Sequence, residues 1–164
     1  GLREIAGTCG MRVTIIRPPL IYGAGAKGNF ALLESAVKRG LPLPFANVTN
    51  RRAFLSVDNL ASFIVHRLSH PDGKFDVFRV ADDQQVSTPE FIVRLARAAK
   101  ATPRLFRLPP LLLSALLKIS GRREANDSLL GSLELDLSKV GRTGWRPPID
   151  LDEGLRRALS GNGN

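Results

Sequence analysis

The sequence is poor in the residues that bind metals or form covalent cross-links. It contains one cysteine, Cys9, and two histidines, His66 and His70, among 164 residues. A single thiol excludes an internal disulfide and favours a reducing compartment. We expect no metal site, because so few ligands do not make a structural zinc centre. The two histidines stand four residues apart, and we interpret them as one partly exposed face of a helix.

Long apolar runs are also missing. The longest, Leu111–Ile119, is well short of the roughly 20 residues that a bilayer-spanning helix needs. We interpret this run as a buried helix, because Pro109 and Pro110 stand at its start, where a missing amide donor costs little. No cationic leader with a cleavage site opens the sequence. The sequence therefore predicts a cytoplasmic location and no membrane partner.

Aromatic residues make up only 6% of the sequence, which gives no obvious stacking surface for nucleic acid. The charge is unusual, because 24 Lys and Arg against 15 Asp and Glu give a formal net charge of +9. A basic surface suits nucleic acid, acidic lipid or a small anion such as a sugar diphosphate. The arginines are scattered, and no nucleic-acid-binding motif is present. We predict no nucleic-acid partner, and a basic nucleic-acid-binding or scaffold module is an alternative that rests on charge alone.

The order of local patterns predicts an α/β protein. The first strand is a continuous β-branched run, which suits a parallel strand covered on both faces. Asp58, Ser87 or Thr88, and Asp150 stand where helix N-caps are expected. Helical patterns cover residues 2–6, 30–39, 60–68, 91–96 and 151–159, and strand patterns cover residues 13–16, 52–57 and 75–80.

Four blocks in this order resemble a known family. RVTIIRPPLIYGAGAKGN (12–29) resembles the strand and loop that follow the catalytic helix of extended short-chain dehydrogenase/reductases. RRAFLSVDNLASFI (51–64) resembles the next strand-to-helix segment of those enzymes. STPEFIVRLARA (87–98) and LDLSKVGRTGWRPPIDLDEGLRRAL (135–159) resemble their closing helices and the turn between them. The chain is most similar to the NAD-dependent epimerase/dehydratase family, and within it to proteins like UDP-glucose 4-epimerase.

The resemblance implies a fold and a division into domains. The expected fold is α/β, the C-terminal part of an extended, doubly wound Rossmann-type epimerase with its small substrate-binding domain. Residues 1–25 are expected to be the last helix and strand of the NAD-binding Rossmann domain. Residues 26–160 are expected to form the nucleotide-sugar-binding region, with segments near 55–82 returning to the Rossmann domain, and residues 161–164 a loose tail. A homodimer of the full-length protein is a further expectation.

The resemblance also implies an activity, NAD-dependent 4-epimerisation of a UDP-hexose, with an NAD(P)-dependent 4-keto reductase or a dehydratase as alternatives. The family's NAD-binding Gly-x-x-Gly-x-x-Gly turn is absent, because Gly23, Gly25 and Gly28 have another spacing and no NAD-sized β-α-β unit is expected around them. The catalytic Tyr-x-x-x-Lys is absent too, because Ala26 stands four residues after Tyr22, the only tyrosine. We therefore expect a substrate-binding segment that is inactive alone and has no catalytic residue.

Phosphate contacts are implied for three residues. Arg52 matches the family arginine that binds the substrate diphosphate, and a guanidinium offers bidentate donors to phosphate. Asn29 matches an asparagine at the start of the helix after the glycine loop, where a side chain and free helix amides suit a phosphate or ribose oxygen. Arg123 matches a second phosphate-binding arginine, with Arg122 as its rival. Each also has an ordinary interpretation as a surface or capping residue.

Contacts with the base, the sugar and the cofactor are implied for five further residues. Leu43 and Phe45 belong to a short extended stretch that pairs with uracil in the family. Pro18 and Pro19 follow the first strand, and in the family this loop borders the nicotinamide of NAD. Leu20 lies where UDP-glucose 4-epimerases carry a substrate-binding asparagine, a departure that argues against glucose/galactose epimerisation itself.

Overall fold

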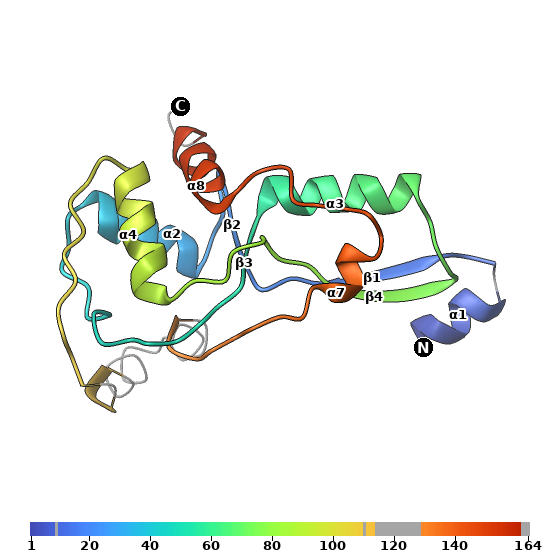
Figure 1. The fold of residues 1–164 in the computed structure, drawn as a ribbon, viewed down its shortest axis with the longest axis horizontal. Helices are drawn as coiled ribbons and strands as arrows, with labels where there is room; N and C mark the ends of the chain where they lie inside the picture. The colour runs from blue at the N-terminus through green and yellow to red at the C-terminus, as the bar shows by residue number, and fades with distance from the viewer. Residues whose placement is uncertain (9, 110, 114–128, 162–164) are drawn as a thin grey trace.

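A computed structural model describes residues 1–8, 10–109, 111–113 and 129–161. The molecule is elongated, and its helices and strands form two groups along the long axis (Figure 1). Each group is built on a pair of parallel strands. In the first group β2 (Leu20–Tyr22) pairs with β3 (Phe54–Ser56), and in the second β1 (Val13–Arg17) pairs with β4 (Phe75–Arg79).

Helices connect the parallel strands. The helix α2 (Asn29–Lys38) lies between β2 and β3, and α3 (Val57–Ser69) lies between β3 and β4. Parallel neighbours need such crossovers, because a tight hairpin reverses the chain direction. The alternation of strands and helices confirms the predicted α/β class. The domain boundaries near residues 25 and 55–82 stay a prediction.

The first turn of α3 corrects one sequence-based expectation. Ser56 is its N-cap, because the Ser56 hydroxyl accepts a hydrogen bond from the Asn59 amide at 3.0 Å. Asp58, predicted as the cap, lies inside the first turn instead. A serine with extended backbone at the end of a strand fulfils the capping role two residues earlier.

The other two predicted caps are confirmed. The helix α4 (Thr88–Ala98) begins after Ser87, whose hydroxyl accepts from the Glu90 amide at 3.2 Å. The helix α8 (Leu151–Ser160) begins after Asp150, whose carboxylate accepts from the Glu153 amide at 2.8 Å. Both helices pack in the first group and contact each other.

Aromatic side chains fill the core of the first group. The rings of Phe54 and Phe91 stack with centroids 4.0 Å apart and planes 14° from parallel. Tyr22 meets the Phe91 ring edge-on at 5.7 Å, and Phe30 does so at 6.4 Å. All four side chains are 1% exposed or less. This core joins β2 and β3 to the apolar faces of α2, α4 and α8.

The second group has a smaller core. Phe63 of α3 contacts the rings of Phe78 and Trp145 at 5.4 and 5.2 Å. The Trp145 indole donates to the Ser62 hydroxyl at 3.1 Å and is buried beside the short helix α7 (Ser138–Gly141). The remaining helix, α1 (Leu2–Thr8), precedes β1. No residue of β1 is fully buried, so the expectation of a strand covered on both faces is wrong for the described chain.

The apolar run 111–119 also differs from its prediction. Only 111–113 belong to the described residues, and they are helical. Leu113 is buried, but Leu111 is 86% exposed and Leu112 is 58% exposed. The predicted buried helix is therefore wrong for these two leucines. Within the described residues, no helix has the length and apolar character that crossing a membrane requires.

Candidate functional site

A buried carboxylate lies where β2, β3 and β4 end. Asp82, just after β4, accepts a hydrogen bond from the Tyr22 hydroxyl at 2.7 Å. Its other oxygen accepts from the Ser56 amide at 3.1 Å and from the Asn59 side chain at 2.7 Å. Asn59 also donates to the carbonyl of Ile149, ahead of α8, at 3.0 Å. The network therefore fixes the carboxyl ends of three strands and the approach to α8.

Burial changes the pKa values of the two ionisable groups in this network, Asp82 and Tyr22. It raises the pKa of the Asp82 carboxyl above the usual 3.8, although the hydrogen bonds from Asn59, Tyr22 and Ser56 act in the opposite direction. Burial also raises the pKa of the Tyr22 hydroxyl above its usual 10, and the neighbouring Asp82 carboxylate adds to the rise. Tyr22 therefore stays protonated near neutral pH and donates a structural hydrogen bond.

A glycine-rich loop joins β2 to α2. Gly23, Gly25 and Gly28 follow β2, and the chain returns through α2 to the parallel neighbour β3. A small β-α-β unit therefore surrounds these glycines, with only three residues in each of its two strands, and the expectation that it is not NAD-sized stays a prediction. Gly28, with φ of 72°, is the N-cap of α2, and partly exposed Asn29 is the first helical residue. The start of a helix is a place at which anions can bind.

Pro18 and Pro19 connect the end of β1 to β2. Pro18 is exposed, Pro19 is partly buried, and Leu20 begins β2 and packs on the edge of the first core. The prolines therefore lie at the carboxyl edge of a parallel strand, the position at which doubly wound folds bind cofactors. Their contact with a cofactor and that of Leu20 with a sugar stay predictions.

Arg52 lies two residues before β3, where its backbone joins two other segments. Its amide donates to the Val86 carbonyl at 2.9 Å, and it also forms a bridge with Leu133. The side chain is buried, with 4% of the residue exposed, and Nη1 donates to the Gly131 carbonyl. Loss of hydration lowers the pKa of this guanidinium, which nevertheless stays charged. Arg51, by contrast, is exposed.

Asn50 and Thr88 also bind the segment around Gly131. We call their hydrogen bonds to residues 129–131 the clamp. The Asn50 amide donates to the carbonyls of Leu129 and Gly131 at 2.9 and 3.1 Å, and its oxygen accepts from the Thr88 amide at 2.9 Å. The Thr88 hydroxyl donates to the Leu129 carbonyl at 2.6 Å. Sequence reasoning missed this clamp, because no local motif links residues so far apart in the chain.

A pocket of about 280 Å³ lies beside the clamp. Two stretches, 47–50 and 130–132, supply most of its lining, and both adjoin residues that bind each other through the clamp. Apolar side chains alternate with amides and hydroxyls, a lining that suits a small organic ligand. The lining residues are Asn47, Val48, Thr49, Asn50, Leu108, Leu113, Leu130 and Ser132.

Leu43 and Phe45 lie on the stretch that leads to this pocket. The Leu43 amide donates to the Arg104 carbonyl at 2.7 Å, and its carbonyl accepts from the Phe106 amide at 3.0 Å. Its backbone groups are thus used within the chain. Phe45 is buried in the first core, and its carbonyl accepts from the Val48 amide at 3.0 Å. The predicted uracil contact at Leu43 and Phe45 stays a prediction.

The last two candidate positions have different outcomes. Arg123 lies outside the described residues, as does its rival Arg122. His66 is partly exposed and its ring nitrogen lies 3.0 Å from the Thr143 carbonyl, while His70 is exposed. The interpretation of the two histidines as a partly exposed helical face is confirmed. Among the described residues, no three His, Cys, Asp or Glu side chains gather in a way that suits a metal ion.

Parallel strands joined by helices, with a pocket and a glycine loop near the strand ends, define a Rossmann-type α/β protein. Residues 2–81 match the model of the NAD dependent epimerase/dehydratase family. The UDP-glucose 4-epimerase of Vibrio cholerae is 38% identical over 158 residues, which are 95% of this chain and 48% of that protein. The GDP-6-deoxy-D-mannose reductase of Pseudomonas aeruginosa is 28% identical over 161 residues, 93% of this chain and 49% of that protein.

A solved structure agrees with this fold. The UDP-glucose 4-epimerase of Thermus thermophilus, in complex with NAD, superposes with a TM-score of 0.70 at 21% identity. The match covers 98% of this chain and 49% of that structure. The chain thus spans about half the length of the proteins it matches. Residues 2–81 thus resemble the NAD dependent epimerase/dehydratase family, and nearly the whole chain is similar to an epimerase and to a reductase.

Proposed function

We propose that the chain is the nucleotide-sugar-binding part of an NAD-dependent 4-epimerase that acts on a UDP-hexose, and that it does not catalyse the reaction alone. The observation that carries the proposal is a pocket lined by Asn50, Leu130 and Ser132, where Arg52 and Asn50 both donate to the Gly131 carbonyl between the last two. A charged guanidinium bound to a stretch that lines a pocket of mixed character suits a ligand that combines an organic ring with phosphate. The similarity to a UDP-glucose 4-epimerase supports the nucleotide-sugar class.

The start of α2 is the proposed second contact with the diphosphate. The N-cap of α2 is Gly28, which has no side chain to cap the helix. A Cβ atom added at Gly25 or Gly28 would meet no atom within 4 Å, so the loop is open to an approaching group. Asn29 adds a side-chain amide at the same place. Phosphate groups bind at such helix starts because amide donors and the helix dipole act together.

The residues present fit NAD only in part. Pro18 and Pro19 offer a rigid apolar edge at the carboxyl end of β1, where we propose that the nicotinamide side of the cofactor lies. NAD would supply the hydride acceptor and donor in the reaction. The sequence holds no Gly-x-x-Gly-x-x-Gly turn for the pyrophosphate. Tyr22 cannot replace the family's catalytic tyrosine, because its hydroxyl is buried and bound to Asp82.

A 4-keto reductase or a dehydratase on the same nucleotide sugar is the second candidate. The observation that favours it is Leu20, an apolar and partly buried residue where UDP-glucose 4-epimerases carry an asparagine that binds substrate. The similarity to a GDP-6-deoxy-D-mannose reductase also supports a reductase. A reductase would transfer hydride once and exchange its cofactor, so NADPH consumption with a 4-keto sugar would distinguish it from an epimerase.

Calorimetric titration with UDP tests the binding proposal. We expect Arg52→Gln to weaken UDP binding by about tenfold to a hundredfold, the loss of a charge-assisted hydrogen bond. Arg51→Gln is the matched control, because Arg51 is the exposed neighbour of the same type. Arg52→Lys should recover part of the affinity, since it keeps the charge but not the paired donors. Thermal unfolding of each variant separates lost binding from lost fold. Equal UDP affinity of the wild type and Arg52→Gln would refute the assignment.

A turnover assay tests the second half of the proposal. Residues 1–164 with NAD should not interconvert UDP-glucose and UDP-galactose, although they should bind UDP. Because binding and turnover are measured separately, a failure of one does not hide the other. Interconversion by these 164 residues would show that the catalytic groups lie within them.

A further inference from the structure

The segment that follows α4 carries large apolar side chains in contact with water. Leu111 is 86% exposed, Leu112 is 58% exposed and Phe106 is 43% exposed. Leu105 packs toward the first core, whereas its neighbours Arg104 and Phe106 are exposed, as the alternation of an extended chain requires. A cluster of exposed apolar side chains that continues through a turn marks a surface for interaction.

The same part of the sequence carries positive charge alone. Residues 91–123 contain no Asp or Glu. Among the described residues, no ion pair involves Lys100, Arg104 or Arg107, although Arg94 in the preceding helix is paired with Glu90. The stretch thus carries nearly all of the net charge of +9, through eight cations: Arg94, Arg97, Lys100, Arg104, Arg107, Lys118, Arg122 and Arg123.

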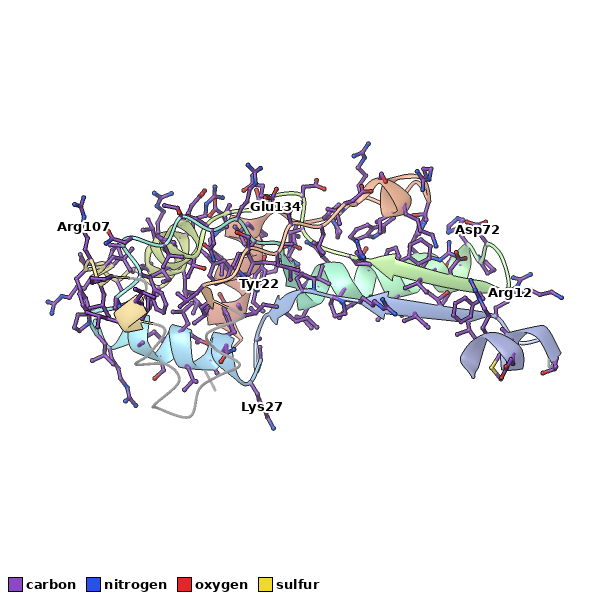
Figure 2. The ribbon with its side chains drawn as sticks, turned by 90° about the horizontal axis from the view of Figure 1, so that it is seen from below. Arg12, Tyr22, Lys27, Asp72, Arg107 and Glu134 are labelled. Atoms are coloured by element: carbon purple, nitrogen blue, oxygen red, sulfur yellow. The ribbon has the colours of Figure 1, made fainter. Side chains whose placement is uncertain are left out.

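This segment forms one end of the elongated molecule. In Figure 1 the chain leaves α4, runs along the outer side of the first group and reaches the short helix that contains Leu111. Figure 2 shows Arg107 at that end, while Arg12 lies at the opposite end of the long axis. Arg107 and the ribbon of residues 100–109 and 111–113 therefore lie at one end of the long axis.

We propose that this basic–apolar end, defined by residues 100–107 and 111–112, binds the surface of an anionic phospholipid bilayer. The cations would contact the headgroups, while Phe106, Leu111 and Leu112 would enter the boundary with the acyl chains. Exposed leucines favour lipid over nucleic acid, because they offer nothing to a phosphate backbone. This surface contact revises the expectation of no membrane partner, which rested on the lack of a spanning segment. The proposal does not rest on the proposed function, although Leu108 and Leu113 of the same part of the chain line the pocket.

Vesicle co-sedimentation of the purified protein tests the proposal. We expect binding to vesicles of phosphatidylcholine with phosphatidylglycerol, and no binding to phosphatidylcholine alone. The double variant Arg104→Gln/Arg107→Gln should bind about 30-fold more weakly, as two cations near an anionic surface predict. The double variant Leu111→Ser/Leu112→Ser should lose at least about tenfold, because both leucines would leave the acyl boundary.

Control variants remove two arginines or one leucine elsewhere on the surface. Arg79→Gln/Arg146→Gln removes two other exposed arginines, and Leu68→Ser removes an exposed leucine of α3. These controls should bind vesicles like the wild type.

A fluorescence measurement reports insertion into the bilayer directly. In Leu112→Trp, the added indole should shift its fluorescence to the blue with anionic vesicles, against a constant signal from buried Trp145. No binding to anionic vesicles, or equal losses in the controls, would overturn the proposal. So would binding of duplex DNA without any binding of vesicles.

Discussion

The two strand pairs of this protein differ in how completely they are covered. All residues of β3 in the first group are buried, whereas none of β1 in the second group is. Within the described residues, β1 pairs with β4 alone, so its other edge carries no strand. A groove of about 480 Å³ lies next to it, between β1 and α3. The first group thus has a closed core, whereas the second has an open sheet edge.

The helix α3 shows the same difference on its two faces. Phe63 and the guanidinium of buried Arg67 contact the Phe78 ring of β4, while Ile64, Val65 and Leu68 are 41%, 61% and 77% exposed. A further strand can pair with such an open strand edge, and further apolar side chains can pack on such a helix face. Stability should therefore depend on the first group far more than on the exposed face of α3.

The largest expected effect comes from a substitution in the core of the first group. Phe91→Ala should lower the free energy of unfolding by about 3–5 kcal/mol, because the ring stacks on Phe54 and contacts two further aromatic rings. Leu68→Ala on α3 should change it by less than about 0.5 kcal/mol. Urea unfolding monitored by circular dichroism measures both. Similar losses for the two variants would contradict the difference between the groups.

The second effect tests how closely α8 approaches β2. A Cβ atom at Gly154 would lie 2.5 Å from the Tyr22 hydroxyl, inside the buried network. Gly154→Ala should therefore destabilise the protein by about 1–3 kcal/mol. Gly141→Ala in the second group meets no atom within 4 Å and should be neutral or slightly stabilising. Thermal unfolding compares the two, and a harmless Gly154→Ala would show that α8 can move away.

The third prediction concerns the loss of one hydrogen bond to the buried Asp82 carboxylate. Tyr22→Phe leaves an Asp82 oxygen without its hydrogen bond and should cost about 1–2 kcal/mol. Ser62→Ala, which removes the acceptor of the Trp145 indole in the second group, should cost less because that pair is only partly buried. The same urea titration serves as the measurement. A larger loss for Ser62→Ala would reverse the proposed order.

The smallest effect concerns pH. Because the pKa of folded Asp82 is raised, its contribution to stability is complete below the usual 3.8 and is lost as pH rises through the folded pKa. Asp82→Asn keeps an acceptor for Ser56 and Asn59 and cannot ionise. We expect it to change stability by less than about 1 kcal/mol near pH 7 and to flatten the profile above about pH 4. Unfolding curves at a series of pH values test this, and an unchanged slope would exclude Asp82 as its source.

Much of the fold follows from local patterns. The strands near residues 13–16 and 75–80 and the caps Ser87 and Asp150 lie where the sequence predicts them, because apolar periodicity and capping act over a few residues. Asp58 shows the limit of this reasoning, since an equally good cap, Ser56, stands two residues earlier and the end of β3 decides between them. The apolar character of Leu111 and Leu112 likewise does not predict that these two side chains are exposed.

The candidate site is also only partly predictable from local patterns. Arg52 and Asn29 are predicted from their place in motifs and stay predictions, but the clamp that Asn50 and Thr88 form on Leu129 joins segments far apart in sequence. No spacing within either segment predicts such a contact. The role of Tyr22 is also hidden, because only the packed structure brings it to Asp82.

By itself, the sequence determined the α/β class, the family resemblance and the positions of most helices and strands, since these depend on short-range periodicity and on motif order. Only the tertiary structure decided which strands pair, that the ends of three strands share one buried carboxylate, and that Arg52 binds the stretch 130–132 beside a pocket. The physical reason is that burial and hydrogen bonding between distant segments arise from packing, which no single stretch of sequence contains.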